Sequence, residues 1–251
     1  MNTKKIYLML ITIAFLVFVV FASAYIFTLN KIDVNFEATS GEQSEELEES
    51  LQQFKGRNLV FLKTEEIATV LSEFTQYKVI EIVKKYPNTI NVSVMQRKET
   101  FAITSEEKTF ILDEEGFVIK SIEDYSSSRE IITLNFNGLE VISCKSGQVI
   151  ETNDNELLFT VMSMAKKVNY YNCISSIEIE KAPEKRYAYL MTYTGVVIEI
   201  PDAHVRGEEK IEFAFDQYDK CEDDFIKSFD KIIVFIDANS GELKATWTKN
   251  V

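Results

Sequence analysis

The first pattern along the chain is an apolar stretch without a charged side chain, residues 6–29. At about 1.5 Å of rise per residue, a helix of this length crosses the roughly 30 Å hydrocarbon core of a bilayer. Lys4 and Lys5 precede the stretch, whereas Asp33 and Glu37 follow it, and this asymmetry places the N-terminus in the cytoplasm. The pattern therefore predicts a cytoplasmic tail over residues 1–5, a transmembrane helix over residues 6–29, and a body beyond the membrane.

A cleaved signal peptide is the alternative interpretation of the same stretch. The basic start, the apolar run and the triplet Ala22-Ser23-Ala24 are typical of such a signal. Against cleavage, the run before Ala22 is already long for a signal peptide, and the apolar character continues to Leu29. Under either interpretation the body of the protein is exported.

Residues 30–98 combine strand and helix patterns. Residues 32–36 alternate strictly, and residues 79–83 and 90–94 read as two further strands joined by a turn at Pro87. Two helices are expected between the first and second strands, with apolar stripes at Leu47, Leu51 and Phe54, and at Ile67, Val70, Leu71 and Phe74. The order β-α-α-β-β predicts two helices on one face of a small three-stranded sheet.

Residues 99–251 are mostly strand-like. A strong helix pattern over residues 155–168 and a weaker one over 208–218 interrupt the strands. The turn signals at Gly116, Gly195 and Gly241 predict hairpins. The expected strands are residues 109–112, 117–120, 131–136, 174–179, 187–191, 196–200, 232–236 and 242–248. The overall fold class is therefore α+β, in which a mostly antiparallel β domain with one or two packed helices follows the smaller module.

Charge and cysteine usage narrow the classes of partner. The formal net charge is −13, and without the two N-terminal lysines the body is more acidic still, which argues against nucleic-acid binding. Cys144, Cys173 and Cys221 are odd in number and far apart, unlike a disulfide framework or a C-x-x-C pair. They are interpreted as small buried side chains, with one disulfide and a free thiol as the alternative.

The sequence offers no constellation typical of catalysis. The single histidine, His204, lies near Asp202 after a proline and is interpreted as a solvated loop residue. Nucleotide-binding glycine patterns and metalloprotease motifs do not occur, and acidic pairs such as Asp223-Asp224 read as surface charge. We therefore expect no catalytic residues, no cofactor and no metal. The residues alone indicate an exported binding module.

Several short segments occur in an order that is similar to a known family. They are residues 56–62, residues 83–94 with Pro87, Gln96-Arg97-Lys98, residues 111–116, and residues 236–241 followed by Trp247. In this order behind the apolar stretch they resemble the FtsQ/DivIB family of bacterial cell division proteins. Residues 36–44 are longer than the usual link, and Gln96 stands where an acidic residue is common. The resemblance implies a POTRA domain over residues 30–98 and a β domain over residues 99–251.

The resemblance also implies a function. The protein would be a non-catalytic scaffold of the divisome at the cell membrane, enriched at the division septum. It would bind small bitopic division proteins similar to DivIC/FtsB and FtsL, and through them help recruit or regulate the septal transpeptidase and polymerase of peptidoglycan synthesis. The alternative is a membrane-anchored, exported ligand-binding sensor or a cell-wall-acting protein.

In the family, the small partner pairs with the final strands of the second domain, which here resemble residues 231–237 and 242–247. A terminal hairpin can leave an edge of unpaired N–H and C=O groups, which is a template for strand addition. The predicted partner-binding residues are Phe235, Asp237, Asn239, Ser240, Gly241, Ala245 and Trp247. The two aromatic residues are the expected anchors. The alternative is that both simply fill the core.

Overall fold

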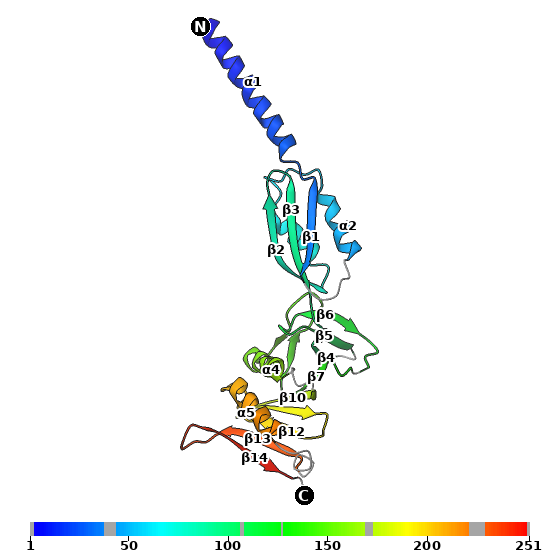
Figure 1. Cartoon of the computed structure of the whole chain (residues 1–251), viewed down its shortest axis with the longest axis vertical. Coiled ribbons are helices and arrows are strands. Elements are labelled where there is room, and N and C mark those ends of the chain that lie inside the picture. Colours follow the sequence, from blue (N-terminus) through cyan, green and yellow to red (C-terminus); the bar gives the residue numbers. More distant parts are fainter. Residues whose placement is uncertain are drawn as a thin grey trace. The chain divides into compact units, whose positions relative to one another are not determined.

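The computed structural model describes residues 3–37, 44–105, 108–126, 128–168, 173–220 and 229–249. The chain divides into two compact units, Met1–Arg97 and Lys98–Val251, which are described separately (Figure 1). Cys221 and the Asp223-Asp224 pair lie outside the described residues, as does most of the link between the first strand and the helix after it.

The first helix, α1, covers Thr3–Ile26 and ends before the apolar stretch does. The N–H of Leu29 donates to the Arg57 carbonyl at 2.8 Å, and the Leu29 side chain is fully buried in the core of the first unit. Within the part of the chain that the structure describes, no helix combines the length and the apolar character that crossing a bilayer requires. The predicted transmembrane helix over residues 6–29 is therefore wrong. The predicted fold class is corrected with it, because the described chain is mostly β, with 40% strand against 28% helix.

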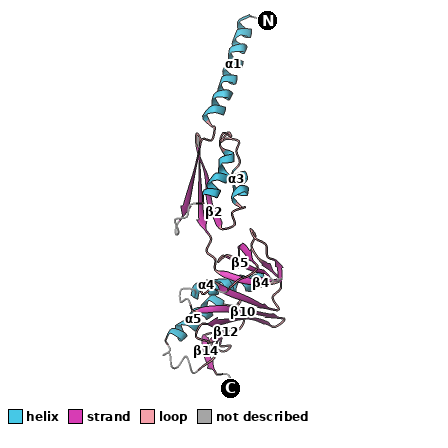
Figure 2. Cartoon of the chain, turned by 90° about the vertical axis from the view of Figure 1, so that its right-hand side faces the viewer, coloured by secondary structure: helices cyan, strands magenta, loops and turns pink. Residues whose placement is uncertain are grey.

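The first unit continues as a small sheet with helices on one face (Figure 2). Its strands lie in the order β1-β3-β2, with β1 parallel and β2 antiparallel to β3. The elements are β1 (Lys31–Glu37), α2 (Glu45–Leu51), η1 (Gln52–Phe54), α3 (Thr64–Leu71), β2 (Tyr77–Lys85) and β3 (Thr89–Gln96). The core between sheet and helices consists of buried apolar side chains, namely Leu29, Leu47, Leu51, Phe54, Leu59, Leu62, Ile67, Leu71, Ile90, Val92 and Val94.

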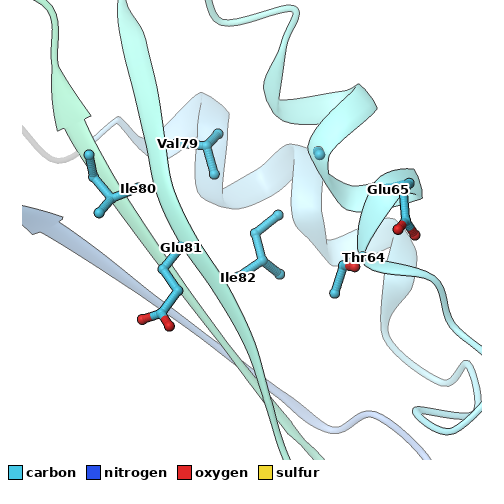
Figure 3. Close-up of a pocket in the computed structure, with 7 residues that line it drawn as sticks. Thr64, Glu65, Val79, Ile80, Glu81 and Ile82 are labelled. Carbon is cyan, nitrogen blue, oxygen red and sulfur yellow. The ribbon is translucent and has the colours of Figure 1, made fainter.

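A β-bulge shapes the outer strand of this sheet. In β2, Val79 pairs with Val94 and Glu81 pairs with Ser93, so Ile80 is an extra residue without a partner on β3. Val79 and Ile82 would point to opposite faces of a regular strand, but the bulge puts both on the side of α3. Figure 3 shows these two side chains toward α3, with Ile80 and Glu81 on the other side of the strand.

The second unit is built on a nine-stranded sheet in the order β14-β13-β12-β11-β10-β7-β4-β5-β6. The first strands are β4 (Phe101–Ser105), β5 (Lys108–Leu112), β6 (Val118–Ile122) and β7 (Ile132–Asn137), with a separate small pair β8 (Val141–Ser143) and β9 (Glu151–Thr152). The later elements are α4 (Asn155–Val168), β10 (Ile174–Ala182), β11 (Lys185–Thr192), β12 (Val197–Ile200), α5 (Gly207–Asp219), β13 (Lys231–Ile236) and β14 (Leu243–Thr248).

This sheet is more mixed than the turn signals indicated. The strand β7 runs parallel to both β4 and β10, and β12 runs parallel to β13. The connections that contain α4 and α5 return the chain to the same end of the sheet, as parallel pairing requires. The sequence had also not indicated the strands β4, β8 and β9.

Both long helices of the second unit cover one face of the sheet. The apolar side of α4, which includes Leu158, Val161 and Ala165, and that of α5, which includes Ile211 and Phe215, belong to one buried cluster. Alternate residues of the strands complete this cluster, among them Ile177, Leu190, Ile198, Ile232 and Val234. The terminal hairpin β13–β14 is therefore supported by the core from one side only.

Candidate functional site

The terminal hairpin ends the large sheet, because β14 has β13 as its neighbour and lies at one end of the strand order. The two strands pair without interruption from Lys231 opposite Thr248 to Ile236 opposite Leu243. Within the described residues, no strand pairs with the other side of β14. This side of β14 is therefore an open edge in the part of the chain that the structure describes.

The direction of the backbone groups along β14 follows from the pairing. The Asp237 N–H donates to the Glu242 carbonyl at 2.8 Å, so this pair is hydrogen-bonded. Bonded and non-bonded pairs alternate in an antiparallel ladder, so Lys244 and Thr246 turn their backbone groups toward β13. The N–H and C=O groups of Leu243, Ala245 and Trp247 therefore point to the open edge. Ala245 lies in the middle of this set.

The turn of the hairpin is held by Asp237. One carboxylate oxygen accepts hydrogen bonds from the N–H groups of Asn239 (3.0 Å) and Ser240 (2.9 Å) and from the Ser240 hydroxyl (3.2 Å). The other lies 2.5 Å from the Lys244 ammonium. The Lys244 ammonium, followed by the two N–H groups, lowers the pKa of Asp237 to about 2. Gly241 adopts a positive φ of 70°, which glycine tolerates without strain.

These contacts place the predicted turn residues in a structural role. The Asp237 carboxylate and the Ser240 hydroxyl form hydrogen bonds within the turn, and Asn239 donates its backbone N–H to the same carboxylate. Gly241 also accepts a hydrogen bond from the Arg206 guanidinium at 3.2 Å. The turn is thereby fixed to the loop before α5.

The loop that receives this contact was not identified from the sequence as part of the site. Asp202 and Arg206 both have positive φ angles, of 46° and 53°. The ammonium of Lys210, a buried residue, donates to the Pro201 carbonyl at 2.6 Å and to the Asp202 carbonyl at 3.0 Å, and its burial lowers the pKa of Lys210. The only sequence signal was a lysine within a weak helical pattern. Such a pattern does not say that the ammonium lies over loop carbonyls.

The two predicted anchor residues lie on opposite faces of the hairpin. Trp247 is paired with Ile232, packs half-buried against the core, and has its ring 5.7 Å from that of Phe229. Phe235 is paired with Lys244 and, being an odd number of residues from Ile232, faces the other way. The structure therefore brings Trp247 and Ala245 together on the core side, and Phe235 does not join them. Because the two rings lie on opposite faces of the hairpin, a single side chain of a partner cannot contact both of them.

Phe235 instead lines a hollow at the end of the sheet. The cavity measures about 140 Å³, and its other walls come from Pro201, Asp202, Val205, Lys210 and Ile236. This volume is below the roughly 300–1,000 Å³ that is usual for small-molecule sites. The hollow suits one side chain of a bound segment better than a separate ligand.

The groups with chemical reactivity lie apart from the hairpin strands. Cys144 and Cys173 are free, and burial raises the pKa of each thiol to about 11, which disfavours the thiolate. His204 is half-buried in its loop, more enclosed than the sequence indicated, and its Nδ1 has no hydrogen-bond partner among the described residues. Among the described residues, no group of three or more His, Cys, Asp or Glu side chains is arranged to hold a metal ion. What the hairpin offers is main-chain pairing.

Comparison with known proteins places these features in context. No model of a protein family matches the chain. A curated relative, the cell division protein DivIB of Clostridium acetobutylicum, is 25% identical over 141 residues, which are 54% of this chain and 54% of the relative. The chain thus matches about half the length of that relative. The match confirms the resemblance to the FtsQ/DivIB family that the sequence motifs indicated.

A solved structure was also found. It is the major extracytoplasmic domain of the trans isomer of the bacterial cell division protein DivIB from Geobacillus stearothermophilus, with 11% sequence identity and a TM-score of 0.31. The alignment covers 51% of this chain and 98% of the solved chain.

Proposed function

We propose that this protein acts in bacterial cell division as a non-catalytic binding protein, and that its terminal hairpin receives an extended segment of a small division protein. The partner class is that of the DivIC/FtsB-like and FtsL-like bitopic proteins. Through them the protein would influence the septal transpeptidase and polymerase at the division site. The resemblance to DivIB supports the process, and the open edge of β14 supports the mode of binding.

The observation that carries the proposal is the regular outer edge of β14, beside which no other strand lies among the described residues. Its outward N–H and C=O groups, such as those of Leu243 and Ala245, can form a ladder with a strand of almost any sequence. Specificity must then come from side chains next to the edge. The half-buried Trp247 ring is the largest of these on the core side, and the exposed Lys244 and Thr246 side chains lie on the other face.

The test compares two neighbouring proline substitutions in the full-length protein. Ala245→Pro removes an N–H that points to the open edge, so it should weaken binding of the partner segment and leave the fold intact. Thr246→Pro removes an N–H of the ladder with β13, and it should lower the free energy of unfolding by about 1–3 kcal/mol because a carbonyl of β13 loses its donor. Thermal unfolding and titration with a peptide from the soluble part of a DivIC-type protein measure the two effects.

Trp247→Ala separates side-chain recognition from main-chain pairing. We expect this variant to bind the same segment more weakly while it still folds. Unchanged binding by both Ala245→Pro and Trp247→Ala, in correctly folded protein, would place the partner on another surface.

A further inference from the structure

One end of the first unit exposes large apolar side chains. The turn between η1 and α3 carries Val60 and Phe61, which are 46% and 80% exposed, and the turn between β2 and β3 carries Tyr86, which is 58% exposed. Apolar groups that gather on an exposed surface indicate contact with another apolar phase or partner.

The two turns lie at the same end of the unit. The Leu59 N–H donates to the Phe27 carbonyl at 2.7 Å, and the Phe27 ring lies 5.9 Å from the Tyr86 ring in an edge-to-face arrangement. Phe27 therefore contacts both turns: its carbonyl binds the first turn at Leu59, and its ring packs on Tyr86 of the second. Figure 1 shows the end of β2 and the start of β3 at this end of the sheet. These turns are thus one surface and not two separate ones.

Lysines surround the apolar side chains. Lys55 and Lys63 flank the first turn, and Lys84 and Lys85 precede the second; three of these four are exposed, and Lys84 is half-buried. None of the four forms an ion pair with the residues that the structure describes. We call this surface the basic-aromatic end, defined as Val60, Phe61 and Tyr86 with Lys55, Lys63, Lys84 and Lys85.

The local charge contrasts with that of the whole chain, whose formal net charge is −13. At the basic-aromatic end Lys85 pairs with Thr89, and the lysines there outnumber Glu65 and Glu66, which follow Lys63 in the first turn of α3. At the opposite end of the sheet, Lys78 and Glu37 both lie opposite Met95. Four glutamates, Glu45, Glu46, Glu48 and Glu49, lie within the seven residues of α2. An acidic protein thus carries a small cationic surface in one place.

We propose that the basic-aromatic end rests on an anionic lipid surface, with the lysines at the headgroups and Phe61 and Tyr86 in the interfacial layer. Lysines near an anionic leaflet are attracted by its surface potential, and aromatic rings are favoured at the depth of the headgroups. The long apolar stems of the lysines allow the rings to enter while the ammonium groups stay in water. The proposal concerns the surface of the folded unit and is independent of binding at β14.

A lipid surface fits these observations better than a folded protein does. The exposed rings lie on two turns, and Lys84 and Lys85 lie at the end of β2, an edge strand whose bulge interrupts its register. An anionic lipid surface can bind exposed lysines and aromatic rings without a groove or a regular strand edge to receive it. If this surface binds a protein instead of lipid, the vesicle experiment below should show no quenching at position 61, and that result would contradict the proposal.

The experiment uses the full chain with Trp247→Phe, which removes the single tryptophan. A tryptophan is then introduced by Phe61→Trp, or by Ile142→Trp on β8, where the native side chain is 68% exposed in the second unit. Each protein is mixed with phosphatidylcholine vesicles that carry brominated acyl chains, with or without phosphatidylglycerol. We expect bromine to quench the tryptophan at position 61, more strongly with phosphatidylglycerol, and to leave the one at position 142 unquenched.

Charge reversal tests whether the lysines cause the contact. Lys63→Glu with Lys85→Glu should reduce the quenching at position 61 to that of position 142. The matched control, Lys145→Glu with Lys249→Glu, changes the net charge equally at exposed lysines of the second unit and should have no effect. Quenching at position 61 that is absent, equal without phosphatidylglycerol, or unchanged by the Lys63 and Lys85 substitutions would overturn the proposal.

Discussion

Each of the two larger sheets ends in an edge strand, and the two edge strands differ by one inserted residue, the bulge at Ile80. In the second unit, β14 is paired regularly along its whole length, and its outer side presents an uninterrupted row of backbone groups. In the first unit, β2 also lies at the end of its sheet, but the bulge at Ile80 breaks its register. Bulges are a common way to keep an edge from pairing with another chain. By this criterion β14 is suited to strand addition and β2 is protected from it.

The difference also affects what lies beside each edge. A groove runs between β2 and α3, and it is lined by Thr64, Glu65, Ala68, Val79, Ile80, Glu81 and Ile82 (Figure 3). The bulge turns Val79 and Ile82 into this groove, where they pack on the core of the first unit. The apolar residues Val79 and Ile82 of β2 therefore serve the fold of the unit itself, whereas Trp247 of β14 is only half-buried.

The largest expected effect tests whether α3 beside β2 is structural. Leu71 is buried to 1% exposure at the end of α3, so Leu71→Ala should lower the free energy of unfolding by about 2–5 kcal/mol through lost burial and a cavity. Partner binding at β14 should be unchanged in the folded fraction. Chemical denaturation and the peptide titration measure both quantities.

The matched control is Thr69→Ala on the exposed side of α3, with an expected change within about 0.5 kcal/mol. If Leu71→Ala cost less than about 1 kcal/mol, a value below the range for buried leucines, and removed partner binding, the α3 side of the first unit would be the interface. The contrast between the edges would then fail.

A smaller effect is expected from the turn that shapes β14. Because the folded pKa of Asp237 is about 2 and the carboxyl group of an unfolded aspartate titrates near ~3.9, its charged form stabilises the folded hairpin. This stabilisation is complete above about pH 4 and is lost as the pH falls toward about 2. Asp237→Asn should therefore melt at a lower temperature than the unaltered protein at neutral pH, and the difference should shrink as acid is added.

Glu242→Gln is the control for this pH dependence, because Glu242 is exposed in the same turn and forms no ion pair with the described residues. Its melting temperature should follow that of the unaltered protein across the pH range. A difference between Asp237→Asn and the unaltered protein that persists undiminished at pH 2 would show that the Asp237 charge is not what holds the turn.

Much of the fold was predictable because strong local patterns agree with the tertiary contacts. The helix expected over residues 155–168 has the same bounds as α4, and the turns with Gly116, Gly195 and Gly241 each join strands. The strand β4 was missed because its five residues mix buried and polar side chains. The parallel pairs were missed because hairpin signals describe only neighbours in sequence.

The candidate site was predictable in part, for a related reason. Hairpin signals place Asp237 to Gly241 in a turn between two paired strands. Local patterns do not show which face each strand residue occupies, and so Phe235 and Trp247 were grouped although they face opposite ways. Contacts such as that of Arg206 with Gly241 join residues far apart in sequence and leave no local signal. The error over residues 6–29 has the same origin, since the burial of Leu29 depends on the loop at Arg57.

The smallest expected change in stability gives the sharpest test of the comparison. Deleting Ile80 removes the extra residue of the bulge while Val79 stays opposite Val94 and Glu81 opposite Ser93, so each side chain keeps its face. The free energy of unfolding should change by about 1 kcal/mol or less, since the removed side chain is 44% exposed. The outer side of β2 then becomes as regular as that of β14.

We expect the deletion variant to self-associate with rising concentration in sedimentation velocity, because its edge is now a template for pairing. Ile80→Ala keeps the bulge, loses the same side chain, and should sediment like the unaltered protein. Self-association by both variants would mean that the exposed isoleucine, and not the bulge, protects β2. A folded deletion variant that remains monomeric would show that a regular edge is insufficient for pairing, and the case for strand addition at β14 would then rest on Trp247 alone.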